Sequence, residues 1–323
     1  GHHSVFEHVY FSIELSDVPK IFAMLLNNEK VFATSEKSAR YTRMNPSVKE
    51  KLLYEKWIEI LQDEIKKNYS NNNYFTDSKI KKLAQENARY FISVFSPTTL
   101  LYSVSYRQLN YIYNWLKDLE NSQFELYRLI SPYAKEFCEQ IEQSGYIDSQ
   151  LKDGKARFFS LIATRTREEH FGESYSVNYQ SSFASFAQAQ RHRTLNYELS
   201  IPKQREFYIP KIIKRNDTLQ HLWLEDMDKV KDLYPQGQLV NVNERGTIEN
   251  FILKCKERLC TCAQLETAEI TKNTLLRYIN EAQSSQIREE LLPYNRGARC
   301  TFPDYSCPAP CHFDEGVTLD RMI

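Results

Sequence analysis

Glycine is scarce in this sequence, with only 8 residues in a chain of 323. Phosphate-binding loops of the Rossmann and Walker types need closely spaced glycines, so proteins of those classes are disfavoured. No apolar run is long enough to span a bilayer and no signal segment opens the chain, so we expect a soluble, cytoplasmic protein that binds no membrane. The 42 basic and 42 acidic side chains cancel, which disfavours nucleic acid as a partner.

Cysteine is rare outside the last quarter of the chain. Cys138 alone lies earlier, and the other six cysteines occupy positions 255, 260, 262, 300, 307 and 311. This clustering indicates a local metal or redox element and not a disulfide framework spread through a secreted fold.

Aromatic residues are abundant, with 21 Tyr and 18 Phe, and they suit packed helices and flat ligands. Prolines predict a loop-like stretch between 202 and 235, and the break at 145–154 predicts a domain boundary. The halves of the chain on either side of this break show a weak internal repeat, which indicates a duplicated domain. Residue periodicity predicts strands over 9–15 and 156–164, helices over 21–26, 48–68, 78–95, 100–119, 124–144 and 246–282, and an irregular tail from 291.

The segment Gln188-Ala-Gln-Arg191-His192-Arg193 ends a predicted helix of small residues over 181–189. Three cationic or hydrogen-bonding side chains delivered together suit an anion or an electron-rich ring. The alternative is a solvated basic turn, because short charged runs are usually surface.

This segment resembles the signature of the flavin-dependent thymidylate synthases, in which Arg-His-Arg is followed by Asn-Glu-x-Ser-x-Arg-Tyr. The opening Gly1-His2-x-Ser4-Val5-x-Glu7-His8 is similar to the family's early motif, and the stretch from Arg258 to Glu266 is similar to its Arg-x-Cys-x-Arg-Ala-Gln-Trp-Glu helix. The resemblance implies an α+β fold with a small sheet and long helices, here as two tandem copies forming a pseudo-dimer. We expect copy one at 1–149, copy two at 150–290 and a cysteine-containing tail at 291–323.

Each copy keeps the part of the signature that the other has lost. Copy one has Asn28-Glu29-Lys30 in place of Arg-His-Arg and Leu25 in place of Gln, but it keeps Glu36-x-Ser38-x-Arg40. Copy two keeps Gln188 and Arg-His-Arg, but it has Ser200-Ile-Pro202 in place of Ser-x-Arg. Family members build each site from two subunits along this same division. The resemblance therefore implies one preserved composite site in a fused chain.

The resemblance also implies residue roles, with Arg258 as the cation that stabilises charge on the uracil ring and Arg191 beside it. Arg107 belongs to Ser105-x-Arg107, which is similar to a flavin-contacting Asn-x-Arg motif. Asn243-x-Arg245 is left unassigned because it lies about a helical turn too far from Arg258. The expected dUMP ligands are Glu36, Ser38, Arg40, Arg89, Gln188, Arg191 and Arg258, and the expected FAD ligands are His8, Arg107, Arg191, His192, Arg193 and Glu198.

Alternatives remain for several of these residues. Arg40 could form an ion pair with Glu36, four residues earlier. His8 could be a core histidine, and Arg258 could lie on a solvated helix face paired with Glu257 or Glu266.

The tail resembles a cysteine-bearing extension seen in some family members. Thiolates at short spacing on a loop suit a closed tetrahedral zinc site, and free or oxidised thiols are the alternative. The candidate zinc ligands are four of Cys260, Cys262, Cys300, Cys307 and Cys311.

The predicted activity is the conversion of dUMP to dTMP by an FAD-dependent thymidylate synthase. Methylenetetrahydrofolate is the expected carbon donor, NADPH the expected reductant, and a homodimer of the tandem chain, resembling a tetramer, the expected assembly. The alternative is a non-catalytic flavin- or nucleotide-binding paralogue, because Ser105, Tyr111 and Cys262 depart from the family pattern.

Overall fold

The computed structural model describes residues 2–37, 46–151 and 161–323, which fall into two compact units. The first unit combines Gly1–Asn45 with Val94–Ile162, and the second combines Pro46–Ser93 with Ala163–Ile323. Residues 46–93 therefore pack with the second half of the chain. These units differ in their bounds from the predicted segments 1–149, 150–290 and 291–323. The division into two repeated copies and a tail stays a prediction.

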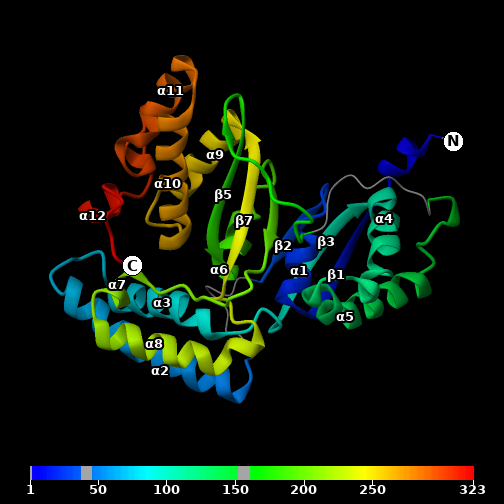
Figure 1. Cartoon of the computed structure of the whole chain (residues 1–323), viewed down its shortest axis with the longest axis horizontal. Helices are drawn as coiled ribbons and strands as arrows, with labels where there is room; N and C mark the ends of the chain where they lie inside the picture. Colours follow the sequence, from blue (N-terminus) through cyan, green and yellow to red (C-terminus); the bar gives the residue numbers. More distant parts are fainter. Residues whose placement is uncertain (1, 38–45, 152–160) are drawn as a thin grey trace. The chain divides into compact units, whose positions relative to one another are not determined.

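The described residues form twelve α-helices and two antiparallel sheets, so the predicted α+β class is confirmed (Figure 1). The helices are α1 (Lys20–Leu26), α2 (Val48–Tyr69), α3 (Asp77–Ala88), α4 (Tyr106–Leu116), α5 (Glu125–Gln143), α6 (Phe183–Ala189), α7 (Lys211–Lys214), α8 (Asp217–Val230), α9 (Ile248–Arg258), α10 (Leu265–Glu281), α11 (Ser285–Leu291) and α12 (Asp314–Val317). The strands are β1 (Tyr10–Pro19), β2 (Ala33–Glu36), β3 (Pro97–Ser105), β4 (His170–Phe171), β5 (Ser174–Ser182), β6 (Asn196–Ser200) and β7 (Leu239–Thr247).

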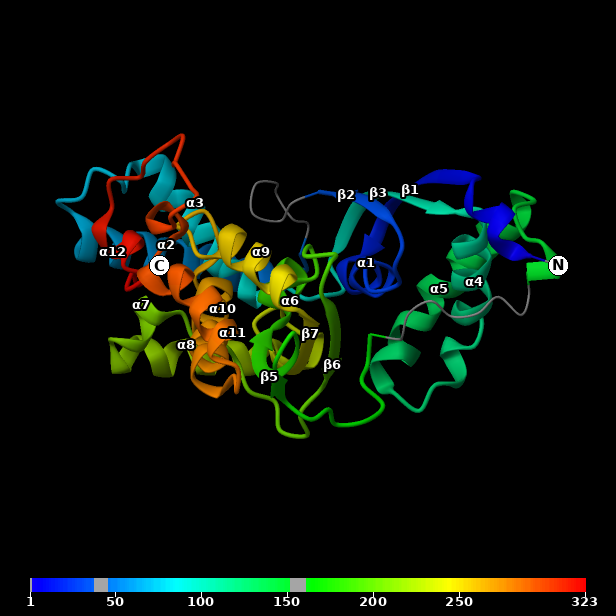
Figure 2. The same ribbon diagram turned by 90° about the horizontal axis from the view of Figure 1, so that it is seen from above.

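The sheet of the first unit has the order β1-β3-β2, and α1, α4 and α5 lie on one of its faces (Figure 2). Along β3, Leu100, Tyr102 and Val104 are buried while Leu101 is exposed. This alternation is expected where one face of a strand packs on a core. The Tyr102 hydroxyl donates to the Leu26 carbonyl at the end of α1 (3.1 Å), which ties the helix to the sheet.

The sheet of the second unit has the order β4-β5-β7-β6. Its strands β5, β7 and β6 repeat the order β1, β3 and β2, because in each sheet the last long strand in sequence lies between the earlier two. In each half a short helix also joins the first two long strands, and two longer helices follow the central strand. The repeated topology supports a tandem duplication, which stays a prediction.

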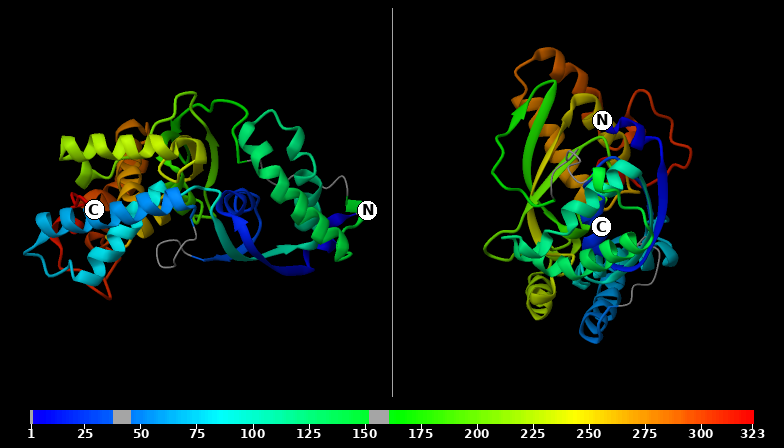
Figure 3. Two further views of the ribbon diagram at one scale, coloured as in Figure 1. Left: turned by 90° about the horizontal axis from the view of Figure 1, so that it is seen from below. Right: turned by 90° about the vertical axis from the view of Figure 1, so that its right-hand side faces the viewer.

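Long helices from both halves of the sequence form the main apolar core of the second unit. Figure 3 shows α2 and α8 running alongside each other. Trp57 on α2 meets Trp223 on α8 edge to face at 4.7 Å between ring centroids, and Phe91 stacks on Trp57 at 5.7 Å. The carboxylate of Asp226 accepts the indole N–H of Trp57 (2.9 Å), so the only polar atom of that buried ring is satisfied.

Two short segments pair in antiparallel fashion beside this core. The amides of Gln236 and Gly237 donate to the carbonyls of Ile92 and Tyr90, both at 2.8 Å. A Cβ at Gly237 would lie 3.0 Å from the Cβ of Tyr90, so only glycine allows this approach. Each segment precedes the central strand of its own half, so equivalent positions of the predicted repeat meet each other.

The structure corrects several expected elements. The predicted helix over 100–119 begins only at Tyr106, because the preceding residues pair with β1 and β2 and form β3. The predicted helix over 78–95 ends at Ala88, and that over 246–282 is two helices separated at 259–264. The stretch 202–235, predicted to be loop, contains α8, and Asn216 is the N-cap of this helix. The strand predicted at 156–164 lies mostly outside the described residues.

Candidate functional site

Arg89 and Gln188 contribute to one buried network in the second unit, although they come from different halves of the sequence. Arg89 follows α3 and donates to the side-chain carbonyl of Gln264, and the backbone N–H of Gln264 donates to Gln188 at 3.4 Å. The exposed fractions of Arg89 and Gln188 are 6% and 8%. A guanidinium and two amides therefore converge in a largely desolvated place, where hydrogen bonds to a charged group are strong.

Glu266 lies beside this network at the start of α10. Its carboxylate accepts from the Tyr90 hydroxyl (2.8 Å) and from both the backbone N–H and the hydroxyl of Ser182 (2.6 Å each). Burial raises the pKa of the Glu266 carboxyl, while the bonds from Ser182 and Tyr90 oppose that rise. Glu266 therefore joins the start of α6 to the residues that follow α3. Gln264 and Glu266 belong to the stretch that resembles the family's Arg-x-Cys-x-Arg-Ala-Gln-Trp-Glu helix, but neither is among the predicted site residues.

The Arg-His-Arg segment does not present three equivalent side chains. Arg191 and Arg193 are exposed, whereas His192 is 3% exposed. Burial, with the nearby charges of Arg258 and Lys254, lowers the pKa of His192 to about 2, so the imidazole is neutral. Its 3.5 Å approach to Glu257 is therefore no ion pair, and its buried Nε2 has no hydrogen-bond partner among the described residues.

Arg258 ends α9 close to this histidine. Its guanidinium lies 3.8 Å from the carboxylate of Glu257, and its side chain is 15% exposed. The suggested pairing with Glu257 is present, but a solvated helix face does not describe so buried a side chain. A cation next to a neutral imidazole can stabilise negative charge that develops on a ligand.

Glu198 lies on β6 and is already bound by two guanidinium groups. Arg167 donates to both carboxylate oxygens, one of them at 2.7 Å, and Arg245 donates at 2.8 Å. These contacts lower the pKa of Glu198 against the effect of its burial. The carboxylate is therefore ionised and internally paired.

The predicted site residues of the first copy lie in the first unit, apart from Arg89. Glu36 pairs with Lys20 (2.7 Å), and Arg107 pairs with Glu7 (2.5 Å). His8 is exposed, so the alternative of a core histidine is wrong. Ser38 and Arg40 lie outside the described residues, and their roles as dUMP ligands stay predictions.

Ser105 and Thr247 occupy equivalent places, since each is the N-cap of the first helix after a central strand. Ser105-x-Arg107 in the first half thus corresponds to Thr247-x-Glu249 in the second. Asn243 and Arg245 lie earlier, within β7, which agrees with leaving that pair unassigned in the sequence analysis.

The described residues contain no group of three or more His, Cys, Asp or Glu side chains able to hold a metal ion, so the zinc site stays a prediction without structural support. None of the seven cysteines is paired in a disulfide. The amide of Arg299 donates to the carbonyl of Leu259 (2.7 Å), which places the Cys260 turn beside the tail.

Comparison with protein families identifies the first part of the chain. Residues 1–143 match the family model described as thymidylate synthase complementing protein. Over these residues the chain is similar to that family. The match includes Arg89 and Arg107. The α+β architecture of the chain is consistent with the fold of that family.

The second half lies outside this match to the thymidylate synthase complementing proteins, so the tandem copy rests on topology and motifs alone. A search of curated proteins gives no match. Within the described ranges, no helix combines the length and apolar character needed to cross a membrane.

Proposed function

We propose that the chain is an FAD-dependent thymidylate synthase that converts dUMP to dTMP, with methylenetetrahydrofolate as the carbon donor. The observation that carries the proposal is the network of Arg89, Gln264 and Gln188. It joins a residue of the family-matched half to residues of the other half, as the complementary motif losses require. The similarity of residues 1–143 to the thymidylate synthase complementing proteins supports the reaction class.

The substrate side of the proposed site consists of Arg89, Gln188 and Arg258, together with Glu36, Ser38 and Arg40. Guanidinium groups suit the nucleotide phosphate because two N–H groups of one side chain can bind two phosphate oxygens. Arg258 is the proposed catalytic cation, and a positive charge next to a uracil carbonyl favours attack from C5 without a cysteine nucleophile.

The flavin side consists of Arg191, His192 and Arg193, with contributions from His8, Arg107 and Glu198. These residues fit the cofactor because His192 has a buried ring nitrogen without a partner and two exposed cations flank it. Bound FAD, reduced by NADPH, would supply the hydride. The neutral imidazole contributes a hydrogen bond and not a charge, so the negative charge of a reduced flavin would be balanced by the arginines.

A non-catalytic nucleotide-binding protein is the second candidate, and the engagement of Arg107 by Glu7 favours it. The corresponding position in the second half is Glu249, a carboxylate and not a guanidinium. Neither position therefore offers a free cation to a flavin.

The test uses the purified full-length chain. We expect a flavin absorbance spectrum that changes on addition of dUMP, and tritium release from C5-labelled dUMP in the presence of methylenetetrahydrofolate and NADPH. Arg89→Lys keeps the charge but loses the planar fork, so we expect about tenfold weaker dUMP binding. The matched control is Arg296→Gln, which alters an exposed arginine elsewhere in the same unit.

Two outcomes would count against the proposed activity, and a separate measurement tests the assembly. Colourless protein that binds neither FAD nor dUMP contradicts both. Binding of FAD and dUMP without tritium release favours the non-catalytic candidate. Light scattering tests the proposed homodimer of the chain, and a monomer would contradict it.

A further inference from the structure

One face of the sheet in the second unit is mostly polar. Across its three long strands the register pairs Asn178 with Asn243 and Gln180 with Asn241, and β6 adds Glu198 opposite Asn243. Residues with this parity point to the same face of the sheet. The face also includes Ser176, Arg245, Asn196 and Ser200, and its one apolar side chain is Leu239, opposite Ser182 at the end of β5.

A short segment crosses this face. The amide of Ala163 donates to the carbonyl of Leu199 on β6 (2.7 Å), and the carbonyl of Arg167 accepts from the side chain of Asn178 on β5 (2.9 Å). We call residues 163–167 the strap. The strap and the polar face enclose a cavity of about 590 Å³, which lies within the range of small-molecule sites.

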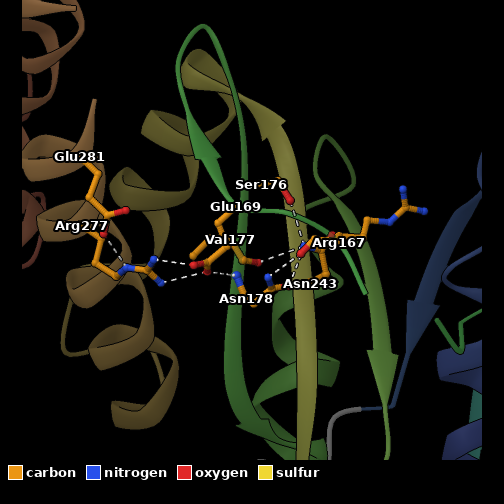
Figure 4. A network of polar contacts seen from close by, with 8 residues as sticks. All are labelled: Arg167, Glu169, Ser176, Val177, Asn178, Asn243, Arg277 and Glu281. Atoms are coloured by element: carbon orange, nitrogen blue, oxygen red, sulfur yellow. Dashed lines mark hydrogen bonds and ion pairs between the residues drawn. The ribbon is translucent and has the colours of Figure 1, made fainter. Parts of the chain in front are cut away.

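One end of the strap is fixed by a network of charged and amide side chains (Figure 4). Glu169 accepts two bonds from Arg277 on α10 (2.8 and 3.1 Å) and one from the backbone N–H of Asn178 (2.7 Å). Arg167 in turn binds Glu198 below it. The strap therefore has a defined position over the sheet.

Three side chains that line the cavity make no hydrogen bond to any described residue. They are the exposed side chain of Arg165 on the strap and those of Gln180 and Asn241, which lie opposite each other on the sheet face that forms the floor of the cavity. Asn243 is 7% exposed and uses its N–H₂ group on Ser176 and Asn178, while its buried Oδ1 has no partner in the described structure. A buried amide oxygen without a partner is costly unless a ligand or water donates to it.

The charges in the cavity favour an anion. Arg165 and Arg167 line the cavity, and the one carboxylate in its lining, that of Glu198, is already paired with Arg167 and Arg245. Arg165 supplies a cation with two parallel N–H donors, the geometry that binds phosphate oxygens. The floor supplies neutral amides, which both donate to and accept from hydroxyl groups.

We propose that the strap and the polar sheet face form a binding site for a small phosphorylated, hydroxyl-rich metabolite such as a sugar phosphate. Arg165 binds the phosphate, and Gln180, Asn241 and the free oxygen of Asn243 bind the hydroxyl groups. The site shares Glu198 with the flavin side of the proposed synthase site, but that carboxylate is already paired with Arg167 and Arg245. Competition with FAD and with dUMP therefore distinguishes the two sites.

Calorimetric titration of the full chain with ribose 5-phosphate tests the site. We expect binding below about 1 mM, with ribose and inorganic phosphate each at least about tenfold weaker. Arg165→Gln should weaken ribose 5-phosphate binding at least about tenfold, and Arg296→Gln should leave it unchanged. The double variant Gln180→Ala/Asn241→Ala alters two exposed floor residues, and it should weaken the sugar phosphate but not inorganic phosphate.

Saturating FAD and saturating dUMP separate this site from the proposed synthase site. We expect unchanged ribose 5-phosphate binding when either is present. Competition by FAD or dUMP would overturn the assignment, as would equal binding of inorganic phosphate and ribose 5-phosphate. Full affinity in the Arg165→Gln variant, or no binding of ribose 5-phosphate up to about 10 mM, would also overturn it.

Discussion

Glu29 stands where the flavin-dependent thymidylate synthases carry the histidine of Arg-His-Arg, and it gives a sharp test of the electrostatics of the first unit. Its carboxyl is fully buried, with the Tyr111 hydroxyl 3.4 Å from one oxygen. The other oxygen, Oε1, has no partner among the described residues. Burial raises the pKa of Glu29 from 4.5 to about 8, and the bond from Tyr111 lowers it only in part.

The sign of the effect on stability follows from proton binding. Between pH 4.5 and about 8 the folded chain keeps a proton on Glu29 that the unfolded chain has lost. The free energy of unfolding therefore falls as the pH rises through this window. Because each tenfold change in proton affinity is worth about 1.4 kcal/mol, the loss by pH 8 is on the order of 4 kcal/mol.

Glu29→Gln removes the ionisable group while keeping its shape. We expect urea unfolding, followed by circular dichroism, to give similar stabilities for the variant and the parent at pH 5. At pH 8 the variant should be more stable by about 3–5 kcal/mol. The control is Glu139→Gln, an exposed carboxylate on α5 of the same unit, which should show no such difference. Parallel pH profiles for Glu29→Gln and the parent would refute a buried, protonated Glu29.

Two further variants test the second unit. Asp226→Ala removes the acceptor of the Trp57 indole N–H and should cost about 2–4 kcal/mol, measured by tryptophan fluorescence in urea; a loss below 1 kcal/mol would mean that water replaces the carboxylate. Lys254→Met leaves the buried carboxylate of Glu244 without the ammonium group that lies 2.6 Å from it. The free energy of unfolding, measured by thermal unfolding, should fall by about 3–5 kcal/mol. Adding Glu244→Gln to this variant should recover part of that loss. If the free-energy changes of the two single variants simply add in the double variant, the ion pair is contradicted.

Local pattern predicted the long helices well but not the strands between them. The helix α5 agrees with its prediction to within a residue at each end, because its apolar stripe is long and regular. The stretch 100–105 has both leucines and aromatics, and only the pairing of β3 with β1 and β2 decides in favour of a strand. The helix α8 was missed because prolines on either side were interpreted as loop, although Pro210 and Pro235 bound this segment and do not interrupt its helix.

For the site, the family resemblance identified residues that local pattern could not relate to one another. Arg89 and Gln188 are 99 positions apart, and their common network depends on Gln264, which no spacing rule connects to them. The polar sheet face has a clearer signal in the sequence, since polar and apolar or aromatic residues alternate along 176–180 and 241–243. Such an alternation predicts a strand with one polar face but no particular ligand.

The packing of residues 46–93 within the second unit has a consequence for how this gene can be divided. A chain ending near residue 149 would carry α2 and α3 without α8, leaving Trp57 with no indole to pack against. Such a fragment would expose apolar surface and tend to self-associate. Separately expressed halves would have to combine before either reached its native state. Recombination that separates the two halves would therefore be selected against, even though the sequence shows them as repeats.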